Sequence, residues 1–371
     1  MEYIKLVDVC KELFAGGDID KKHLSFEASE DNNVPIYTNG EGNYGLYGYT
    51  NKARVNEVAI TISARGTIGY SCLRTTPFYP AVRLIVAVPD TSKIEPKFLL
   101  YYINSKKYGG RGASIPQLTI PMLKNEVIPL FKMQHQKGIV SILDKINAII
   151  DADKKQLELL DEAVKSRFIE MFEFDKYTKL PLSELVFPKG KISYGIVVPG
   201  NKVESGIPMI RPLNFKNDYI DLTDLYVVSP SIEEKYCKTR LSGDEILVQV
   251  IGQPGRVMMT NNDCKGMNIT RNLALISYNQ EMISKYYLKY YLELDESQAF
   301  LLNQVNQATL AQLPLNRLKD LLIAVPEFDK QIEFEIFAKQ IDKSKFNVQQ
   351  HLNLMQELLD KKMKEFFGGA E

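Results

Sequence analysis

Residues 58–69 read VAITISARGTIG, and residues 245–255 read EILVQVIGQPG. Each stretch is an apolar run rich in β-branched residues that ends in a Gly-x-x-Gly segment, Gly66–Gly69 in the first and Gly252–Gly255 in the second. β-Branched residues favour strands, and glycine permits the turns that end them. We therefore predict a strand followed by a glycine-bearing turn at both places.

These two stretches belong to a longer internal repeat. The further pairs keep the same order along the chain: Tyr3-x-Lys5-Leu6 with Tyr177-x-Lys179-Leu180, Phe14-x-x-Gly17-x-Ile19 with Phe187-x-x-Gly190-x-Ile192, VPIY (34–37) with IPMI (207–210), Arg83 with Arg271, FLLYYI (98–103) with YLKYYL (287–292), Gln117-Leu118 with Gln312-Leu313, Pro129-x-x-x-x-Gln134 with Pro326-x-x-x-x-Gln331, and ELLD (158–161) with ELLD (357–360). An ordered set of this length indicates a duplication. The offset between copies is interpreted as growing steadily, through insertions in the second copy.

Each copy is expected to end in a long helix, at about residues 132–172 and 329–367. Apolar residues spaced three, four or seven apart predict a coiled-coil seam in each helix. The seam residues are Ile139, Ile142, Ile146, Ile149, Leu160, Val164, Phe168 and Met171 in the first helix, and Phe334, Phe337, Ile341, Val348, Leu352, Met355, Leu359, Met363 and Phe366 in the second. Asp153, Ser344 and Lys345 interrupt these seams. Such residues either fix the register of a seam or face solvent at irregular positions.

The net charge is zero, but residues 52–111 hold ten basic and three acidic residues, and residues 235–289 hold eight and four. A local basic face is what phosphate binding requires, although solvated surface charge is the alternative. The four cysteines form no CxxC pair, and no run of 18 apolar residues occurs. We therefore expect a reduced, cytoplasmic protein with no secretory signal and no membrane span.

Motifs for catalysis on DNA are missing from the sequence. It contains no glycine-rich cofactor loop with an Asp/Asn-Pro-Pro-aromatic segment, no GxxxxGK[S/T] phosphate loop and only three histidines. Asp90 and Glu95-Pro96-Lys97 spell the letters of a PD…ExK nuclease motif. Only four residues separate the two carboxylates, and Pro96 cannot donate within a central strand, so we interpret this segment as a turn before a helix. No catalytic residue and no metal ligand is predicted.

The repeat, the Pro-x-x-x-x-Gln segments and the paired long helices together resemble the specificity subunit of type I restriction–modification systems. The residues that carry the resemblance are Ile128-Pro129…Gln134 with ELLD and Phe168…Phe172, and Val325-Pro326…Gln331 with ELLD and Phe366-Phe367. The ARGTIG and GQPGRV segments look like the corresponding parts of that family's target-recognition domains. The resemblance covers the whole chain.

The resemblance implies that two recognition domains lie at opposite ends of an antiparallel helix pair and that each reads half of a split, asymmetric site in double-stranded DNA. It implies two modification subunits that supply S-adenosylmethionine and methyl transfer, joined by restriction subunits that use ATP and Mg²⁺. The chain itself is then expected to be a non-catalytic subunit without a cofactor. The expected fold class is α/β (α+β), with recognition domains at 1–128 and 175–325 and spacer helices at 129–174 and 326–371.

Candidate DNA contacts follow from residue chemistry, because Arg and Lys bind guanine or phosphate and Asn and Gln bind adenine. The candidates are Arg65, Arg83, Lys106, Lys107 and Arg111 in the first copy, and Arg211, Arg256, Lys265, Asn268, Arg271, Gln304, Asn306 and Gln307 in the second. Arg83 and Arg271 match each other in predicted strands, which is compatible with phosphate anchoring or with a shared structural ion pair. The alternative functions are a duplicated β-rich scaffold without DNA specificity and a self-sufficient restriction or modification enzyme.

Overall fold

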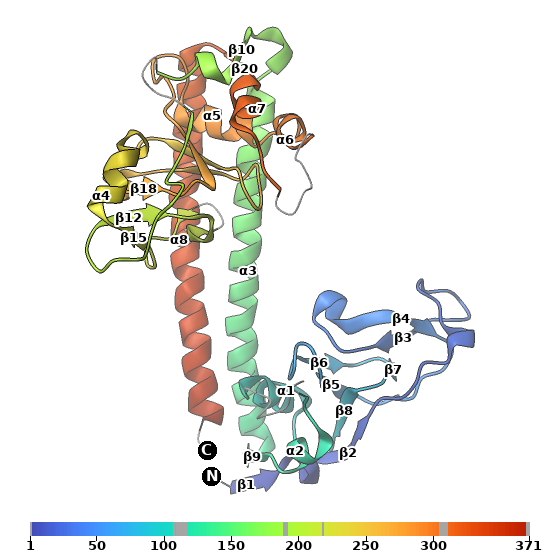
Figure 1. The fold of residues 1–371 in the computed structure, drawn as a ribbon. Helices are drawn as coiled ribbons and strands as arrows, with labels where there is room; N and C mark the ends of the chain where they lie inside the picture. The colour runs from blue at the N-terminus through green and yellow to red at the C-terminus, as the bar shows by residue number, and fades with distance from the viewer. Residues whose placement is uncertain are drawn as a thin grey trace. The chain divides into compact units, whose positions relative to one another are not determined.

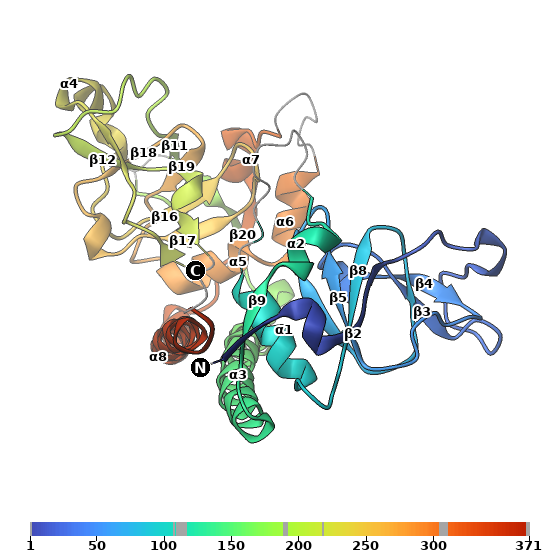
Figure 2. The same ribbon diagram turned by 90° about the horizontal axis from the view of Figure 1, so that it is seen from below.

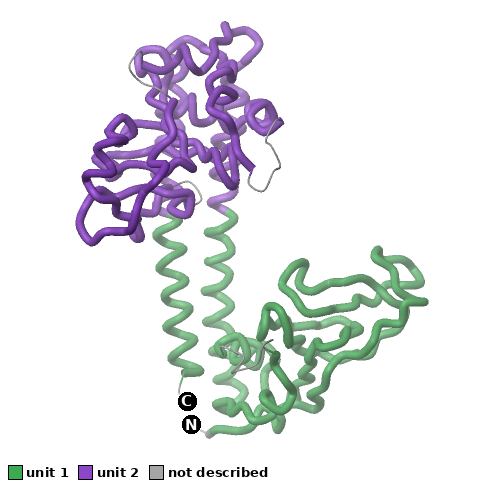
Figure 3. The backbone as a smooth tube through the Cα atoms, viewed as in Figure 1, with its two compact units in different colours: residues 1–155, 348–371 green, residues 156–347 purple. Residues whose placement is uncertain are grey.

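The apolar run at residues 59–63 forms the buried strand β5 (Ala59–Ser63), and its counterpart forms β16 (Ile246–Gln249), as predicted. The computed structural model describes residues 2–106, 108, 117–187, 192–216, 219–303 and 311–368. Contacts divide the chain into two units, residues 1–155 with 348–371 and residues 156–347, coloured separately in Figure 3. Each unit therefore includes a globular part and one segment of each long helix.

The first unit is built on a four-stranded antiparallel sheet in the order β2-β8-β5-β6 (Figures 1 and 2). A second sheet has the order β4-β3-β7, and β1 pairs with β9. Helix α1 packs against β5 and β6. The bounds are β1 (Glu2–Lys5), β2 (Cys10–Ala15), β3 (Val34–Tyr37), β4 (Leu46–Thr50), β6 (Ser71–Arg74), β7 (Tyr79–Pro80), β8 (Leu84–Pro89), α1 (Pro96–Ser105), α2 (Ile120–Lys124) and β9 (Val127–Leu130).

The second unit repeats this topology strand for strand. Its sheets are β11-β19-β16-β17, β15-β12-β18 and β10-β20, and one additional hairpin, β13-β14, is present. The bounds are β10 (Lys179–Pro181), β11 (Ser193–Tyr194), β12 (Ile207–Ile210), β13 (Phe215–Lys216), β14 (Tyr219–Ile220), β15 (Tyr226–Val228), α4 (Pro230–Glu233), β17 (Val257–Met259), β18 (Asn268–Ile269), β19 (Leu273–Ile276), α5 (Lys285–Leu292), α6 (Asp295–Leu302), α7 (Leu315–Asp320) and β20 (Leu322–Ala324). The predicted duplication is confirmed.

Equivalent hydrogen bonds show which residues truly correspond. The amide of Leu118 donates to Ala64 O, and that of Leu313 donates to Val250 O. These equivalent bonds agree with the sequence match of Gln117-Leu118 with Gln312-Leu313. Gly16 corresponds to Gly195, because their amides donate to Leu84 O and Leu273 O, and a Cβ on either would lie 2.0 Å from a backbone oxygen.

This correspondence corrects two of the sequence matches. The match of Gly17 with Gly190 was wrong, because the counterpart of the neighbouring Gly16 is Gly195. The match of Arg83 with Arg271 was wrong by one residue. Leu84 corresponds to Leu273, so the counterpart of Arg83 is the residue directly before Leu273, and Arg271 lies one place earlier. Both arginines precede strands rather than lying in them. The offset between copies therefore does not grow steadily along the chain.

A buried glutamine joins each long helix to the globular part of its unit. The side-chain oxygen of Gln331 accepts from the amide of Ser284 at 2.8 Å, and its nitrogen donates to Pro326 O at 2.9 Å and Met282 O at 3.3 Å. Gln136 makes the same three contacts in the first unit, from Glu95 N and to Phe131 O and Lys93 O. The sequence match of Gln134 with Gln331 was therefore wrong by two residues.

The long helices are α3 (Met133–Met171) and α8 (Phe328–Phe367), within one residue of the predicted bounds. They run antiparallel in both units, because residue numbers fall along α8 as they rise along α3. Phe168 contacts Phe334 and Asp161 pairs with Lys345 in the second unit. In the first unit Asp153 lies 2.7 Å from His351.

The seam differs in part from the predicted one. Ile139, Ile146, Val164 and Phe168 are buried as predicted. Asp153 is buried as well, so of its two alternatives the solvent-facing position does not apply. Ile142 and Ile149 are exposed instead, and Leu143 and Ile150 occupy the buried positions beside them. Ser344 is also exposed, so it does not interrupt the seam. A one-residue shift of this kind moves a side chain about 100° around a helix, which periodicity alone does not resolve.

Candidate nucleic-acid interface

The glycine turn of the first unit holds Arg65 in a defined position. The left-handed Gly69 (φ +87°) closes the turn by donating its amide to Ser63 O at 2.9 Å. Arg65 is half-buried, and its Nε and Nη2 donate to the same oxygen, Oε1 of Gln117, at 3.0 and 2.8 Å. This neutral acceptor orients the guanidinium without cancelling its charge, so Arg65 is well placed to meet an anionic or guanine partner.

The equivalent turn of the second unit holds Arg256. Gly255 (φ +96°) donates to Gln249 O at 2.9 Å, and its own carbonyl accepts from Nε2 of Gln298 at 3.0 Å. The Arg256 guanidinium lies 5.6 Å from the ring centre of Phe215 in β13. Arg65 and Arg256 are not equivalent residues, because Arg65 precedes its turn and Arg256 follows it. The two turns therefore present different side chains from the same structural frame.

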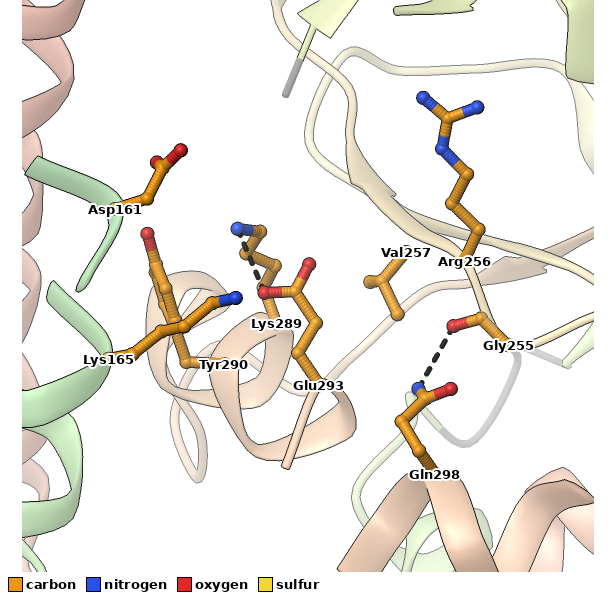
Figure 4. Close-up of a pocket in the computed structure, with 9 residues that line it drawn as sticks. All are labelled: Asp161, Lys165, Gly255, Arg256, Val257, Lys289, Tyr290, Glu293 and Gln298. Atoms are coloured by element: carbon orange, nitrogen blue, oxygen red, sulfur yellow. Dashed lines mark hydrogen bonds and ion pairs between the residues drawn. The ribbon is translucent and has the colours of Figure 1, made fainter. Parts of the chain in front are cut away.

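A cavity of about 300 Å³ lies beside the Arg256 turn, lined by α3, α5 and α6 (Figure 4). Its charged residues are largely paired, since Lys289 lies 3.1 Å from Glu293 and Asp161 pairs with Lys345. Figure 4 shows the Arg256 guanidinium extending away from the Lys289–Glu293 pair. The described lining includes no histidine or cysteine. Gln298, which lines this cavity, holds the turn through its hydrogen bond to Gly255 O.

The other described cationic candidates differ in their surroundings. Lys265, Arg83 and Arg271 are exposed, and within the described residues no ion pair engages the two guanidinium groups. The alternative of a shared structural ion pair for Arg83 and Arg271 therefore has no support among the described residues. Lys106 ends α1, with its Nζ 5.1 Å from the ring centre of Tyr102. Arg211 lies over Tyr226, and its buried Nε has no hydrogen-bond partner in the part of the chain that the structure describes.

Asn268 is not an exposed base reader. It is 0% exposed, and its amide nitrogen donates to Glu233 Oε1 at 3.0 Å and Tyr236 O at 3.1 Å. Its oxygen accepts from the hydroxyl of Thr239 at 2.8 Å. Because every group of the amide is engaged internally, the prediction of a base contact by Asn268 is wrong. Arg240 completes this network through Glu233, and its hydrogen bond lowers the pKa of that buried carboxyl.

Five candidates lie outside the residues that the structure describes, namely Lys107, Arg111, Gln304, Asn306 and Gln307. They remain predictions. Arg74, one of the ten basic residues between 52 and 111, is a buried cation that was not among the predicted contacts. Arg74 is 8% exposed, donates from Nε to Thr61 Oγ1 at 3.0 Å and from Nη2 to Tyr44 O at 2.6 Å, and stacks 3.5 Å from the ring centre of Tyr37.

The residues that spell PD…ExK form a turn and a helix cap, in agreement with the interpretation of the sequence. Asp90 accepts from the amide and hydroxyl of Ser92, and Glu95 caps α1 by accepting from the amide of Phe98 at 2.8 Å. Across the described part of the chain, no three His, Cys, Asp or Glu side chains gather as metal ligands would. No helix in that same part combines the length and apolarity needed to cross a bilayer.

Comparison with known proteins agrees with this architecture. Residues 1–162 and again residues 166–355 match the family described as type I restriction modification DNA specificity domain. The specificity subunit of the type I restriction enzyme EcoBI from Escherichia coli is 24% identical over 268 residues, which cover 65% of this chain and 56% of that protein. The chain spans about half the length of the first curated relatives it matches.

Two solved structures share the fold along the whole chain. The crystal structure of the type I restriction-modification S subunit from M. genitalium has a TM-score of 0.62 at 16% identity and covers 99% of this chain and 96% of its own. A structure described as the basis of complex assembly and conformational transition of the type I system has a TM-score of 0.57 at 14% identity, covering 100% and 98%. Since the family matches both halves of the chain, and the two halves share one topology, this protein belongs to the family of type I restriction–modification specificity subunits.

Proposed function

We propose that this chain is the DNA-reading subunit of a type I complex, in which each unit recognises one half of a bipartite, asymmetric site in double-stranded DNA. The observation that carries the proposal is that the two units share one topology but present different turns. A shared frame lets each unit meet the duplex in an equivalent pose, and different side chains in the turns read different bases. The remaining exposed cations provide phosphate contacts that position the protein.

The long helices serve as the spacer between half-sites. At 39 and 40 residues, α3 and α8 are each about 60 Å long, at ~1.5 Å per residue. Both are continuous through the two units, so the gap in the DNA site depends on their length. Lengthening both helices by equal numbers of residues should change the gap and leave the bases of both half-sites unchanged.

The same helices dock two modification subunits, which restriction subunits then join. Seven exposed apolar side chains on the two helices are available for docking: Ile142, Ile149 and Leu354 in the first unit and Leu159, Ile169, Ile336 and Phe346 in the second. Specificity subunits of type I systems are in general non-catalytic. The partners therefore supply S-adenosylmethionine, ATP and Mg²⁺, and purified chain alone should transfer no methyl groups.

The function is tested by mapping methylated bases in cells that contain the modification subunits with or without this chain. A split motif should appear only with the chain. Arg256→Ala should then relax a position in one half-site, at a cost of about 1–3 kcal/mol for a lost base contact. Arg65→Ala should act on the other half-site. An Arg256 variant that altered both half-sites would contradict the modular proposal.

A further inference from the structure

The connection between β3 and β4, residues 38–45, is held in a defined conformation and is exposed at residues 41–44. Its tip reads Gly-Glu-Gly-Asn-Tyr-Gly, and the side chain of Tyr44 is 69% exposed. Asn43 (φ 47°, ψ 39°) and Tyr44 (φ 53°, ψ 27°) both adopt the left-handed conformation. Two successive non-glycine residues in that region are uncommon, and such a turn persists only where the surrounding structure holds it.

Hydrogen bonds hold the connection, and two of them join it to the Arg65 turn. The carboxamide oxygen of Asn39 accepts from the amide of Ala64 at 2.7 Å, and the amide of Gly40 donates to Ser63 Oγ at 3.1 Å. The amide of Thr38 donates to Gly45 O at 2.8 Å, and the buried Arg74 donates to Tyr44 O at 2.6 Å. The connection that carries Asn43 and Tyr44 is therefore joined to the residues just before Arg65.

The corresponding connection of the second unit also lies beside the glycine turn of its unit, but it has a different structure. It leads from β12 to β15 through the hairpin β13–β14, and it exposes Tyr219 by 57%. The Phe215 ring at its base lies under the Arg256 guanidinium. In both units, then, the connection after the equivalent strand lies against the glycine turn and displays a tyrosine.

We propose that Asn43 and Tyr44 in the first unit, and Tyr219 in the second, are base-contacting specificity residues that act beside the Arg65 and Arg256 turns. The inference rests on the proposed function and deepens it. The Asn43 amide matches the N6 and N7 groups of adenine in the major groove, and the tyrosine hydroxyls both donate and accept. Because the turn is already ordered, binding does not have to fix its conformation. The different connections contribute to reading two different half-sites.

The test uses the full chain in complex with its modification subunits. Asn43→Gly and Tyr44→Gly remove the side chains and keep the turn, because glycine adopts positive φ without strain. Tyr219→Ala is the counterpart in the second unit. Met122→Ala is the matched control, since Met122 is an exposed side chain of the first unit on α2, away from the β3–β4 connection (Figure 1). Affinity is measured on duplexes that carry each single-base change in the methylated motif.

Asn43→Gly should weaken binding to the wild-type site by about 5- to 150-fold and relax one or two positions of one half-site, as expected for a lost base contact. Tyr219→Ala should relax the other half-site, and Met122→Ala should change neither. Unchanged affinity and motif in the glycine variants would overturn the inference. So would a uniform loss on all sequences with a smaller salt dependence, which marks phosphate contacts. A wild-type complex without any split motif would instead overturn the proposed function.

Discussion

The two buried glutamines, Gln136 and Gln331, offer a direct test of how each long helix is joined to its unit. Replacement by methionine preserves length and volume but removes both the acceptor and the donor. In Gln331→Met, the amide of Ser284 and the carbonyl of Pro326 lose partners at 2.8 and 2.9 Å, and the Met282 carbonyl loses a longer one. Gln136→Met removes the equivalent contacts of Glu95 and Phe131.

The size of the effect follows from the number of backbone groups left unpaired. Each buried group without a partner costs about 1–3 kcal/mol, so the two groups with the shorter hydrogen bonds cost roughly 2–6 kcal/mol before the apolar methionine offsets part of the loss. For a unit of this size the melting temperature should fall by on the order of 5–15 °C. Both substitutions should show it, because both side chains are fully buried.

Gln134→Met is the matched control, because Gln134 lies two residues away on the same helix and is exposed. It should change the free energy of unfolding by less than about 0.5 kcal/mol. The assay is calorimetric unfolding of the full chain, with the variants compared in one buffer. Equal destabilisation by Gln134→Met and Gln136→Met would refute the structural correspondence of Gln136 with Gln331, and so would wild-type stability of both buried variants.

Two further predictions concern the second unit. The pKa of the buried Glu233 is lowered, first by its hydrogen bond from Arg240, so its stabilising contribution is present above pH 4.5 and is lost as the pH falls toward the lower folded-state value. The stability difference between wild type and Glu233→Gln, measured by urea unfolding, should therefore shrink in acid; a difference that grows there would contradict this sign. Phe334→Ala should cost about 3–5 kcal/mol, because its fully buried ring packs 4.9 Å from that of Phe168, whereas Phe346→Ala on the exposed face of α8 should cost far less in the same urea assay.

Local pattern in the sequence was enough to identify the repeated architecture. Strands β5 and β16 follow from β-branched runs that end at glycines, and α3 and α8 follow from apolar spacing over many turns. These features depend on interactions between residues close in sequence, such as the allowed backbone angles and the burial of one helix face. The duplication and the family resemblance could therefore be predicted from the sequence alone.

The partners of individual polar side chains were decided only by the tertiary structure. Asn268 looks like a base reader in the sequence, but Glu233 and Tyr236, more than thirty residues earlier in the chain, enclose its amide. The sequence alone does not show whether Gln134 or Gln136 corresponds to Gln331. The fold decides for Gln136, because it places the amide of Glu95 against that side chain. The turn at Asn43 was not predicted, because the residues that hold it, Ser63, Ala64 and Arg74, lie elsewhere in the chain. Burial and hydrogen bonding depend on which distant segments meet, and a pattern along one segment does not contain that information.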